Sequence, residues 1–490
     1  MGVIWEYIGT TWDFLMQYLV FLNIFFAIII IFFQRRDPKT VWTWLLLLYF
    51  IPILGFIFYL LIGTDMRKRK MFKSKGLEER LNEAVRRQEC EIKNKELERK
   101  VPEITGYSDL VMYNLETMGA VLSDDNDLTI FDDGNDKLDA LLEDIRSAES
   151  FIHIQYYIIK DDVVFARIRE ALEKKAAEGV EVRILFDAMG CRFVSRKMWK
   201  ELRRADIRTA EFFPAVLGKF HLRMNYRNHR KIVVIDNRVG YVGGFNVAKE
   251  YVGLDEGFGY WRDTHLRIAG TAVAGLELRF LTDWNYASGE NLFMHDKYIS
   301  GYVPGNKDRC EIQIISSGPD SVEQTIRDNY VRLIHKARKC IYIQSPYFVP
   351  DEAMMSALYV AVCSGIDVNI MIPCKPDHPF VYWATYSYIG DLVMAGAKCY
   401  IYEKGFLHAK GILVDEDVFC YGTANMDIRS FALNFEVNAV VYDKGKACEM
   451  KELFVSDLKY CKQITKDDYA GRGLGIRVKE QISRLLSPLL

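Results

Sequence analysis

Two stretches of the chain carry the same spacing of chemically useful residues. The first runs from His229 to Asn246 as HRKIVVIDNRVGYVGGFN, and the second runs from His408 to Asn425 as HAKGILVDEDVFCYGTAN. In each stretch a lysine lies two residues after the histidine, and an aspartate follows four mostly apolar residues later. Chance does not easily produce two runs with matching internal spacing, so the duplication is the main functional signal in the sequence.

The repeated spacing brings together groups that bind anions. Lysine side chains supply cations, and asparagine amides and backbone amides of glycine-containing turns supply neutral donors. Doubled around one point, these donors form a cradle for an anion with several oxygens, such as a phosphoryl group. The residues predicted to bind phosphate are Lys231, Lys410, Asn246, Asn425, Gly244 and Thr423.

The two histidines supply the reactive groups. An imidazole with a pKa of about 6.5 can attack, accept a proton or donate one near neutral pH. One of His229 and His408 can act as a covalent nucleophile while the other protonates the leaving alcohol, and the roles reverse in a second step. Attack and departure take place on opposite faces of phosphorus, which explains the need for two copies. A single run of this kind could equally be a histidine and a lysine at the rim of an ordinary strand, without any catalytic role.

The two HxKxxxxD runs, followed by GGFN and GTAN, resemble the paired motifs of the phospholipase D superfamily. The resemblance covers the whole chain beyond its apolar N-terminal part. It implies transfer of a phosphatidyl or related group through a phosphohistidine, with no metal and no cofactor. It also implies that His229 is the nucleophile and His408 the acid and base.

The resemblance further implies an acidic partner for each histidine, well past the motif. The candidates are Asp263 in GYWRDTH and Glu436 in NFEVN, each assigned to the histidine of its own half of the sequence. The aspartates of the motif itself, Asp236 and Asp415, belong to the same catalytic motif but are interpreted as structural groups at the ends of strands.

Alternating helix and strand patterns precede each motif and predict an α/β fold. The apolar strands and intervening helices are typical of βαβ units in a sheet covered by helices, with Gly179 and Gly365 at helix C-termini. We expect two pseudo-symmetric phospholipase D-type lobes, each a mixed sheet flanked by helices. The predicted helices are 138–150, 161–179, 326–339 and 350–365, and the predicted strands are 151–160, 180–190, 340–349 and 366–374.

The N-terminal part contains two long apolar runs, 14–33 and 41–62, without a charged residue. Each reaches the roughly 20 residues that a membrane-spanning helix needs, and the acidic start of the chain does not suit a signal peptide. We expect a two-helix transmembrane hairpin. Lys and Arg are more frequent after the second run than between the runs, which predicts a multi-pass membrane protein with its catalytic part in the cytoplasm.

These patterns predict four segments. Residues 1–63 hold the hairpin, 64–105 form a charged helical linker at the membrane surface, 106–305 form the first lobe, and 306–490 form the second lobe with an amphipathic C-terminal segment. The formal net charge of -2 argues against a nucleic-acid partner. The ten cysteines show no CxxC spacing, which argues against a zinc site or a disulfide framework.

Four further stretches are similar to the bacterial cardiolipin synthases of the phospholipase D type: RRDPKTVWTWLLLLYFIPILGFIFYLLIG, NYRNHRKIVVID, GYWRDTHLRIAG and the terminal RLLSPLL. The resemblance implies a protein of the bacterial plasma membrane that converts two phosphatidylglycerol molecules into cardiolipin and glycerol. A phospholipase D that uses water, a transferase with another acceptor such as phosphatidylethanolamine, and a lipid-binding membrane scaffold without activity are the alternatives. A homodimer is left open.

Three other stretches allow two interpretations. The aromatic residues of 210–226 and 378–390 could dock acyl chains or dip into the membrane, or they could simply form core. The final residues 476–490 could form an amphipathic helix on a membrane surface or an ordinary packing helix.

Overall fold

The structure, a computed structural model, describes residues 18–32, 38–53, 55–56, 59, 77–214, 225–299, 309–375 and 378–487. The chain divides into two compact units. The small unit comprises Met1–Arg69 and Ala215–Tyr226, and the large unit comprises Lys70–Pro214 and Arg227–Leu490.

The small unit contains helical residues 18–32 and helix α2 (Pro38–Phe50). Its buried side chains Ile30, Trp44, Leu48 and Tyr59 form a small cluster. Within the part of the chain that the structure describes, no helix combines the length and the apolar character needed to cross a membrane. The predicted spans 14–33 and 41–62 both extend into residues outside the described ones, so the hairpin stays a prediction.

The large unit is built on one sheet in which the same strand order occurs twice. The first half runs β1-β9-β7-β6-β2-β3-β4 and the second runs β10-β19-β17-β16-β11-β13-β14-β20. Strands β1 and β10 pair antiparallel where the halves meet, which relates them by a pseudo-two-fold axis. The strands of the first half are β1 (Ser123–Phe131), β2 (Phe151–Tyr156), β3 (Glu181–Asp187), β4 (Ile207–Phe212), β6 (Ile232–Ile235), β7 (Val239–Gly243) and β9 (His265–Ala269).

The second half has corresponding strands and one extra edge strand. They are β10 (Cys310–Ser317), β11 (Cys340–Gln344), β13 (Asp367–Pro373), β14 (Lys398–Tyr402), β16 (Gly411–Val414), β17 (Val418–Gly422), β19 (Asn434–Val441) and β20 (Cys461–Ile464). Both halves mix parallel and antiparallel pairs, because β2 and β11 each pair parallel on one side and antiparallel on the other. The predicted mixed α/β sheet is therefore confirmed.

Short strands connect the halves near their junction. Strand β5 (Arg227–Asn228) pairs parallel with β19, and β8 (Tyr260–Arg262) pairs parallel with β15 (Gly405–Leu407). Each pair joins a segment of one half to a segment of the other. Two further short strands, β12 (Phe348–Val349) and β18 (Met426–Asp427), pair with each other.

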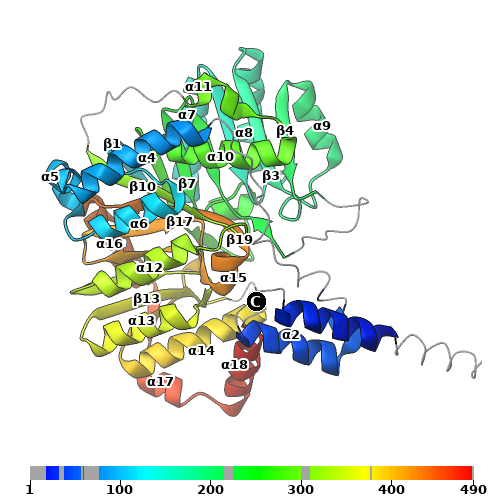
Figure 1. Cartoon of the computed structure of the whole chain (residues 1–490), viewed down its shortest axis with the longest axis vertical. Coiled ribbons are helices and arrows are strands. Elements are labelled where there is room, and N and C mark those ends of the chain that lie inside the picture. Colours follow the sequence, from blue (N-terminus) through cyan, green and yellow to red (C-terminus); the bar gives the residue numbers. More distant parts are fainter. Residues whose placement is uncertain are drawn as a thin grey trace, which may run out of the picture. The chain divides into compact units, whose positions relative to one another are not determined.

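Helices cover the sheet, and α12, α13 and α14 lie side by side over the second half (Figure 1). The helices of the large unit are α4 (Leu77–Lys93), α5 (Glu96–Lys100), η1 (Pro102–Ile104), α6 (Ser108–Met118), α7 (Gly134–Ser147), α8 (Val163–Ala177), α9 (Arg196–Arg204), η2 (Lys249–Val252), α10 (Val273–Ser288), η3 (Leu292–Met294), α11 (Asp296–Ile299), α12 (Thr325–Lys336), α13 (Glu352–Cys363), α14 (Pro379–Ala395), α15 (Ile428–Ala432), α16 (Lys444–Leu458), α17 (Lys466–Ala470) and α18 (Leu474–Leu486).

The predicted helix and strand order of both halves is confirmed by α7-β2-α8-β3 and α12-β11-α13-β13. Gly179 and Gly365 have φ angles of 92° and 87° just after α8 and α13, the left-handed conformation expected past a helix C-terminus. The segment from α5 to α6 contributes Leu97, Ile104 and Leu110 to the hydrophobic core of the second half. Part of the predicted linker therefore packs on the protein, and the predicted segment boundaries stay predictions.

Candidate active site

Each motif histidine lies in a short segment that is hydrogen-bonded to the other half of the large unit. His229 precedes β6, and its amide donates to the carbonyl oxygen of Phe435 on β19 over 3.0 Å. His408 precedes β16, and its amide donates to the carbonyl oxygen of Arg262 on β8 over 2.7 Å. Both histidines therefore lie at the junction of the halves.

Both imidazoles are paired with a carboxylate across this junction. Nδ1 of His229 lies 3.0 Å from each carboxylate oxygen of Glu436, and Nδ1 of His408 lies 2.6 Å from Oδ2 of Asp263. The sequence predicts that each acid pairs with the histidine of its own half; this prediction is wrong, because each acid pairs with the histidine of the other half. Because Nδ1 faces the carboxylate, Nε2 of each ring is the nitrogen left for a substrate.

The two carboxylates are held in different ways. Glu436 accepts hydrogen bonds from Oγ1 of Thr423 over 2.6 Å and from Nδ2 of Asn434 over 3.2 Å. Asp263 instead lies against Gly244, where a Cβ atom would come within 1.8 Å of its Oδ1. The first half therefore requires glycine at the position where the second half uses Thr423 to hold the longer acid.

Gly244 and Thr423, which the sequence predicts to bind phosphate, have backbone amides that are hydrogen-bonded within the protein. The amide of Gly244 donates to the carbonyl oxygen of Thr264 over 2.9 Å, and that of Thr423 donates to the carbonyl oxygen of Val437 over 3.0 Å. The structure therefore places both residues beside the carboxylates.

The two motif lysines are fully buried close to the imidazoles. Nζ of Lys231 donates to the carbonyl oxygen of His229 over 2.8 Å, and Nζ of Lys410 donates to the carbonyl oxygen of His408. Nζ of Lys410 also lies 2.7 Å from Nδ1 of His408 and 3.7 Å from Oδ2 of Asp263. Burial lowers the pKa of Lys231 to about 7, with Glu436 opposing this shift. An anion bound beside these lysines would favour their charged forms.

The two motif asparagines are buried but have unequal surroundings. Asn246 accepts a hydrogen bond from the amide of Ile158 over 3.1 Å and donates one to the hydroxyl of Tyr251 over 2.8 Å. The side-chain oxygen of Asn425 has no hydrogen-bond partner among the described residues. The amide of Asn425 is therefore the less constrained of the two.

Burial dominates the electrostatics of both imidazoles. It lowers the pKa of His229, and the Glu436 carboxylate opposes the shift while Lys231 and Lys410 add to it. Burial and Lys410 lower the pKa of His408 to about 4, against the opposing charge of Asp263. Each lysine acts on the histidine of the other half as well as on its own, which shows that the two motifs share one electrostatic environment.

The acid opposite His408 is influenced by two opposing effects. Burial raises the pKa of Asp263, but the charges of Lys410 and His408, together with hydrogen bonds from His408 and the Thr264 amide, hold the pKa below its usual range. Asp263 therefore stays ionised at neutral pH and can accept a hydrogen bond from the imidazole.

The motif aspartates lie away from the histidines, at tight turns between strands. Asp236 accepts hydrogen bonds from the amides of residues 149–151 over 2.7 to 2.8 Å, and Asp415 accepts from the amides of residues 338–340 over 2.7 to 3.0 Å. Both have left-handed backbone conformations, with φ angles of 54° and 56°. This placement supports the interpretation that both are structural.

Aromatic side chains beside the histidines were not predicted from the sequence. The ring of Tyr157 lies 5.0 Å from that of His229, and the ring of Trp261 lies 5.0 Å from that of His408. Tyr251 and Phe406 are further neighbours of His408. Trp261 lies two residues before Asp263 in GYWRDTH, and this position next to a candidate acid could have identified it as a site residue.

Two aromatic residues of the stretch 210–226 pack in the core beside strand β19, which carries Glu436. Phe212 and Phe213 are buried, and they contact Phe435, the neighbour of Glu436, with ring centroids 5.4 and 6.0 Å away. They therefore form core at this position. Residues 215–224 of the same stretch lie outside the described residues.

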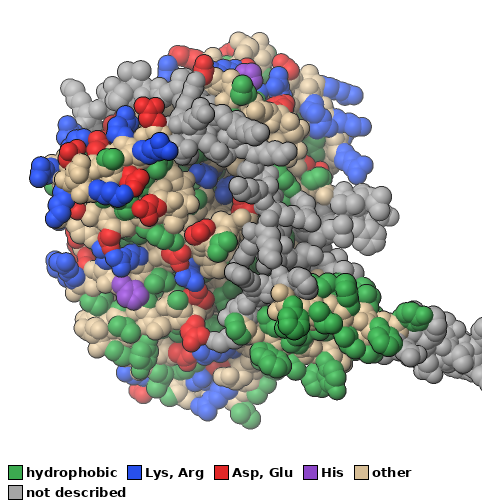
Figure 2. Space-filling view, viewed as in Figure 1, with side chains coloured by type: hydrophobic (Ala, Val, Ile, Leu, Met, Phe, Trp, Pro, Cys, Tyr) green, Lys and Arg blue, Asp and Glu red, His purple; other side chains and the backbone are tan. Residues whose placement is uncertain are grey.

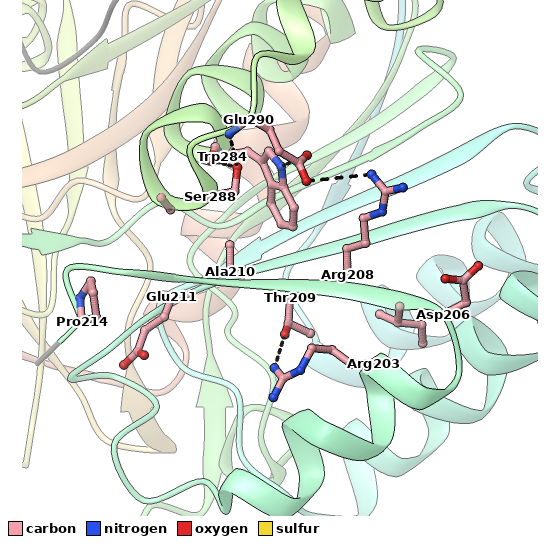
Figure 3. A pocket seen from close by; sticks show the side chains of 12 residues that line it. Arg203, Asp206, Arg208, Thr209, Ala210, Glu211, Pro214, Trp284, Ser288 and Glu290 are labelled. Atoms are coloured by element: carbon pink, nitrogen blue, oxygen red, sulfur yellow. Dashed lines mark hydrogen bonds and ion pairs between the residues drawn. The ribbon is translucent and has the colours of Figure 1, made fainter. Parts of the chain in front are cut away.

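A groove of about 650 Å³ lies along the edge strand β4 and the end of α10 (Figure 3). Charges of both signs line it, including Arg203, Arg208 and Glu290, and no motif histidine or lysine does. Lys and Arg side chains gather over nearby α9, whereas charges of both signs are interspersed over much of the visible face (Figure 2). The groove is therefore separate from the histidine site.

A protein-family comparison matches this architecture. The family model described as "Cardiolipin synthase, PLD-like domain" matches residues 141–284 and 330–458, which include both motifs. A second model, "Phospholipase D-nuclease N-terminal", matches residues 21–63. The chain belongs to the cardiolipin synthase family.

Several members of the cardiolipin synthase family are similar over nearly their whole length. The major cardiolipin synthase ClsA of Bacillus subtilis is 48% identical, with 96% of this chain and 97% of the relative aligned. Cardiolipin synthase 2 of Staphylococcus epidermidis is 47% identical over 96% of both chains. Cardiolipin synthase of Listeria monocytogenes is 45% identical over 97% of this chain and 99% of the relative.

A solved structure supports the fold assignment. The phosphatidylserine synthase of Haemophilus influenzae superposes with a TM-score of 0.57 and 13% sequence identity, over 74% of this chain and 93% of that one. At this identity, the likeness concerns the fold alone. Among the described residues, no group of three or more His, Cys, Asp or Glu side chains could hold a metal ion.

Proposed function

We propose that this member of the cardiolipin synthase family transfers the phosphatidyl group of one phosphatidylglycerol to the terminal hydroxyl of a second. The products are cardiolipin and glycerol. Membership of the family and 48% identity to a named cardiolipin synthase support the reaction. The observation that carries the mechanism is the crossed pairing of His229 with Glu436 and of His408 with Asp263.

In the first step, Nε2 of His229 attacks the phosphorus of phosphatidylglycerol. The bond from phosphorus to the head-group glycerol oxygen breaks, and Nε2 of protonated His408 gives its proton to that oxygen. Glu436 accepts the Nδ1–H of His229, which fixes the tautomer with a free electron pair on Nε2 and stabilises the positive ring that forms. The phosphatidyl group is then bound to His229, and glycerol leaves.

In the second step, the neutral His408 removes a proton from the terminal hydroxyl of the second phosphatidylglycerol. The resulting oxygen attacks phosphorus, and the phosphorus–nitrogen bond to His229 breaks. His408 ends the cycle protonated, ready to act again as an acid. One phosphodiester replaces another, so the reaction needs no nucleotide.

Lys231 and Lys410 are the proposed cations of the phosphate site. Both are fully buried, so their charges act without screening by bulk water. Asn246 and Asn425 would donate side-chain N–H groups to the same phosphate. Gly244 and Thr423 act indirectly in this proposal, because they position the carboxylates behind the histidines.

The low pKa of His408 in the free enzyme is compatible with an acid role once substrate binds. With a pKa of about 4, the ring is neutral at pH 7 before binding. A phosphodiester brings a negative charge next to the ring, which raises the pKa of His408 and favours the protonated form. Binding of substrate would thus prepare the acid for the first step.

The N-terminal segment suits an enzyme whose substrates are bilayer lipids. We propose that 14–33 and 41–62 form a membrane hairpin, that 64–105 link it to the lobes 106–305 and 306–490, and that these lobes are cytoplasmic. The match of residues 21–63 to the N-terminal family model supports this arrangement.

The direct test uses purified full-length protein in lipid–detergent micelles with phosphatidylglycerol as sole lipid, chelator present and no nucleotide. We expect mass spectrometry to detect cardiolipin and an equal amount of glycerol. The proteins with His229→Ala or His408→Ala should form neither, and each should keep the wild-type unfolding temperature.

Other products would overturn the proposal in defined ways. Phosphatidic acid in place of cardiolipin would make water the acceptor and the protein a hydrolase. Turnover only after addition of phosphatidylethanolamine would indicate a different acceptor. No turnover of any lipid would favour a scaffold role.

A further inference from the structure

The C-terminal helix α18 exposes its apolar side chains. Leu474, Val478, Ile482 and Leu485 recur at helical spacing, and their exposed fractions are 78%, 49%, 51% and 80%. A helix that only covers a protein core turns such a row inward. Here the apolar row of α18 faces outward from the large unit.

The opposite face of α18 is polar and is the face that packs on the protein. Glu480, Ser483 and Ser487 are buried, and Nε of Arg472 donates to Glu480 over 2.8 Å. The hydroxyls of Ser487 and Tyr388 lie 3.1 Å apart, which joins α18 to α14. Turning the apolar row inward would break these contacts, so the outward orientation is fixed by specific polar bonds.

A further polar contact and a close approach fix α18 and the preceding α17 to α14. Nη1 of Arg484 on α18 lies 2.6 Å from Oδ2 of Asp391 on α14. The ring of Tyr469 packs so closely against Gly390 of α14 that a Cβ atom there would come within 1.8 Å of it. The apolar row of α18 therefore lies on a fixed support.

Positive charges lie beside the apolar row. Arg477 and Lys479 are exposed on α18, and no carboxylate lies within ion-pairing distance of either among the described residues. Nζ of Lys479 lies 5.0 Å from the ring centre of Trp383 on α14, and Phe380 on α14 is exposed. Apolar side chains next to uncompensated cations and aromatic rings match the boundary between acyl chains and anionic head groups.

We propose that α18 is a membrane-docking helix that lies in the plane of a bilayer containing anionic phospholipid. Its apolar row enters the acyl-chain boundary, and Arg477 and Lys479 contact phosphate groups. Each cation near an anionic surface strengthens binding to it. Membrane docking by α18 goes beyond the proposed reaction. It rests on that reaction only because the proposed substrates are lipids.

The test measures the depth of single positions in full-length protein reconstituted in nanodiscs of phosphatidylglycerol and phosphatidylcholine. An environment-sensitive fluorophore is attached to Val478→Cys or, as matched control, to Val455→Cys on α16. Both valines are on helix surfaces, with exposed fractions of 49% and 45%. The background protein has serine in place of its exposed cysteines, Cys90, Cys363 and Cys448.

We expect the fluorophore at position 478 to shift its emission to shorter wavelength and to be quenched by lipids brominated on their acyl chains. The fluorophore at position 455 should show neither effect and should be quenched by aqueous iodide. Equal behaviour at the two positions would overturn the proposal. A second outcome would also overturn the proposal: an emission shift at position 478 without quenching by brominated lipids, together with disulfide-linked dimers of an Ile482→Cys protein. In that case a second copy of the chain, and not the bilayer, would cover the apolar row.

This measurement requires no turnover, so it can be repeated with the His229→Ala protein. A failed reaction and a failed docking surface are thereby distinguished. As a functional readout, the Val478→Ser/Ile482→Ser protein should lose activity on bilayers and keep full activity on soluble short-chain phosphatidylglycerol. Equal loss on both substrates would contradict membrane docking as the role of the row.

Discussion

The two halves of the large unit are alike in backbone support and different in the groups that hold the histidines. Asp236 and Asp415 accept hydrogen bonds from three consecutive amides each, at nearly equal distances. In contrast, one imidazole is paired with an aspartate beside a glycine, and the other with a glutamate bound by threonine. Duplication has kept the parts that build the strand turn and allowed the parts around the rings to diverge.

The divergence is coordinated within each pair. Glu436 is one methylene longer than aspartate, and Thr423 and Asn434 fix its additional freedom. Asp263 is shorter and lies where Gly244 leaves room for it. Because the two rings have different partners, they need not have interchangeable roles, and variants of the partners can separate those roles.

The largest effect should follow from neutralising the carboxylates. Glu436→Gln and Asp263→Asn keep the shape but remove the charge that fixes the imidazole tautomer, so we expect kcat to fall about 10³- to 10⁴-fold. The measurement is cardiolipin formation by each folded variant. If either variant kept more than a tenth of the activity, the crossed pairs would be structural and not catalytic.

The pH dependence of kcat/KM should reveal the contribution of the Lys231 cation. In the free enzyme Lys231 has a pKa of about 7, so its side chain loses its positive charge as the pH rises through 7. Because kcat/KM reports groups of the free enzyme, and the acid His408 has a pKa of about 4 there, kcat/KM should already decline above about pH 4. We expect the decline to become steeper above about pH 7, where Lys231 also loses its proton. Lys231→Arg keeps a cation at higher pH, so its alkaline limb should move upward. An unchanged limb in this variant would assign the titration to another group.

Removing the hydroxyl of Thr423 should have a smaller effect. Thr423→Val keeps the shape of the side chain and loses the hydrogen bond to Glu436, so we expect a roughly tenfold fall in kcat, on the order of 1.4 kcal/mol. Thr423→Ser retains the hydroxyl and is the matched control, with activity close to wild type. Equal losses in the two variants would place the effect in packing.

The smallest catalytic effect should come from the motif aspartates. Asp236→Asn and Asp415→Asn each weaken hydrogen bonds from three amides, so we expect each to lower the free energy of unfolding by about 1 to 3 kcal/mol. Because the two geometries match, the two losses measured by thermal unfolding should be similar. Turnover per folded molecule should stay at the wild-type level, and loss of phosphoenzyme in a folded Asp236→Asn protein would contradict the structural interpretation.

Local sequence patterns were sufficient to predict the helices and strands before each motif and the chemistry that the motif residues can perform. The apolar runs before each motif predicted β2, β3, β11 and β13, because periodicity and flanking glycines are local properties. The interpretation of Asp236 and Asp415 as structural came from the family resemblance together with their positions at strand ends. The amides that they bind, those of residues 149–151 and 338–340, are distant in sequence and were not predicted.

The partner of each histidine could not be derived from sequence position. Asp263 is nearer to His229 in sequence, yet the pairing of β8 with β15 carries it to His408. Such a contact depends on how two halves join, which no local pattern encodes. The orientation of α18 is a similar case, since its amphipathic sequence does not reveal which face is buried.

The central claim is that one histidine forms the covalent bond and the other protonates the leaving group. It is tested most directly with a phosphatidyl ester of p-nitrophenol, whose leaving group needs no acid. Single-turnover kinetics should show a burst of p-nitrophenol with His408→Ala and none with His229→Ala. A burst that survives in His229→Ala and is lost in His408→Ala would contradict the account, because His408 would then be the nucleophile.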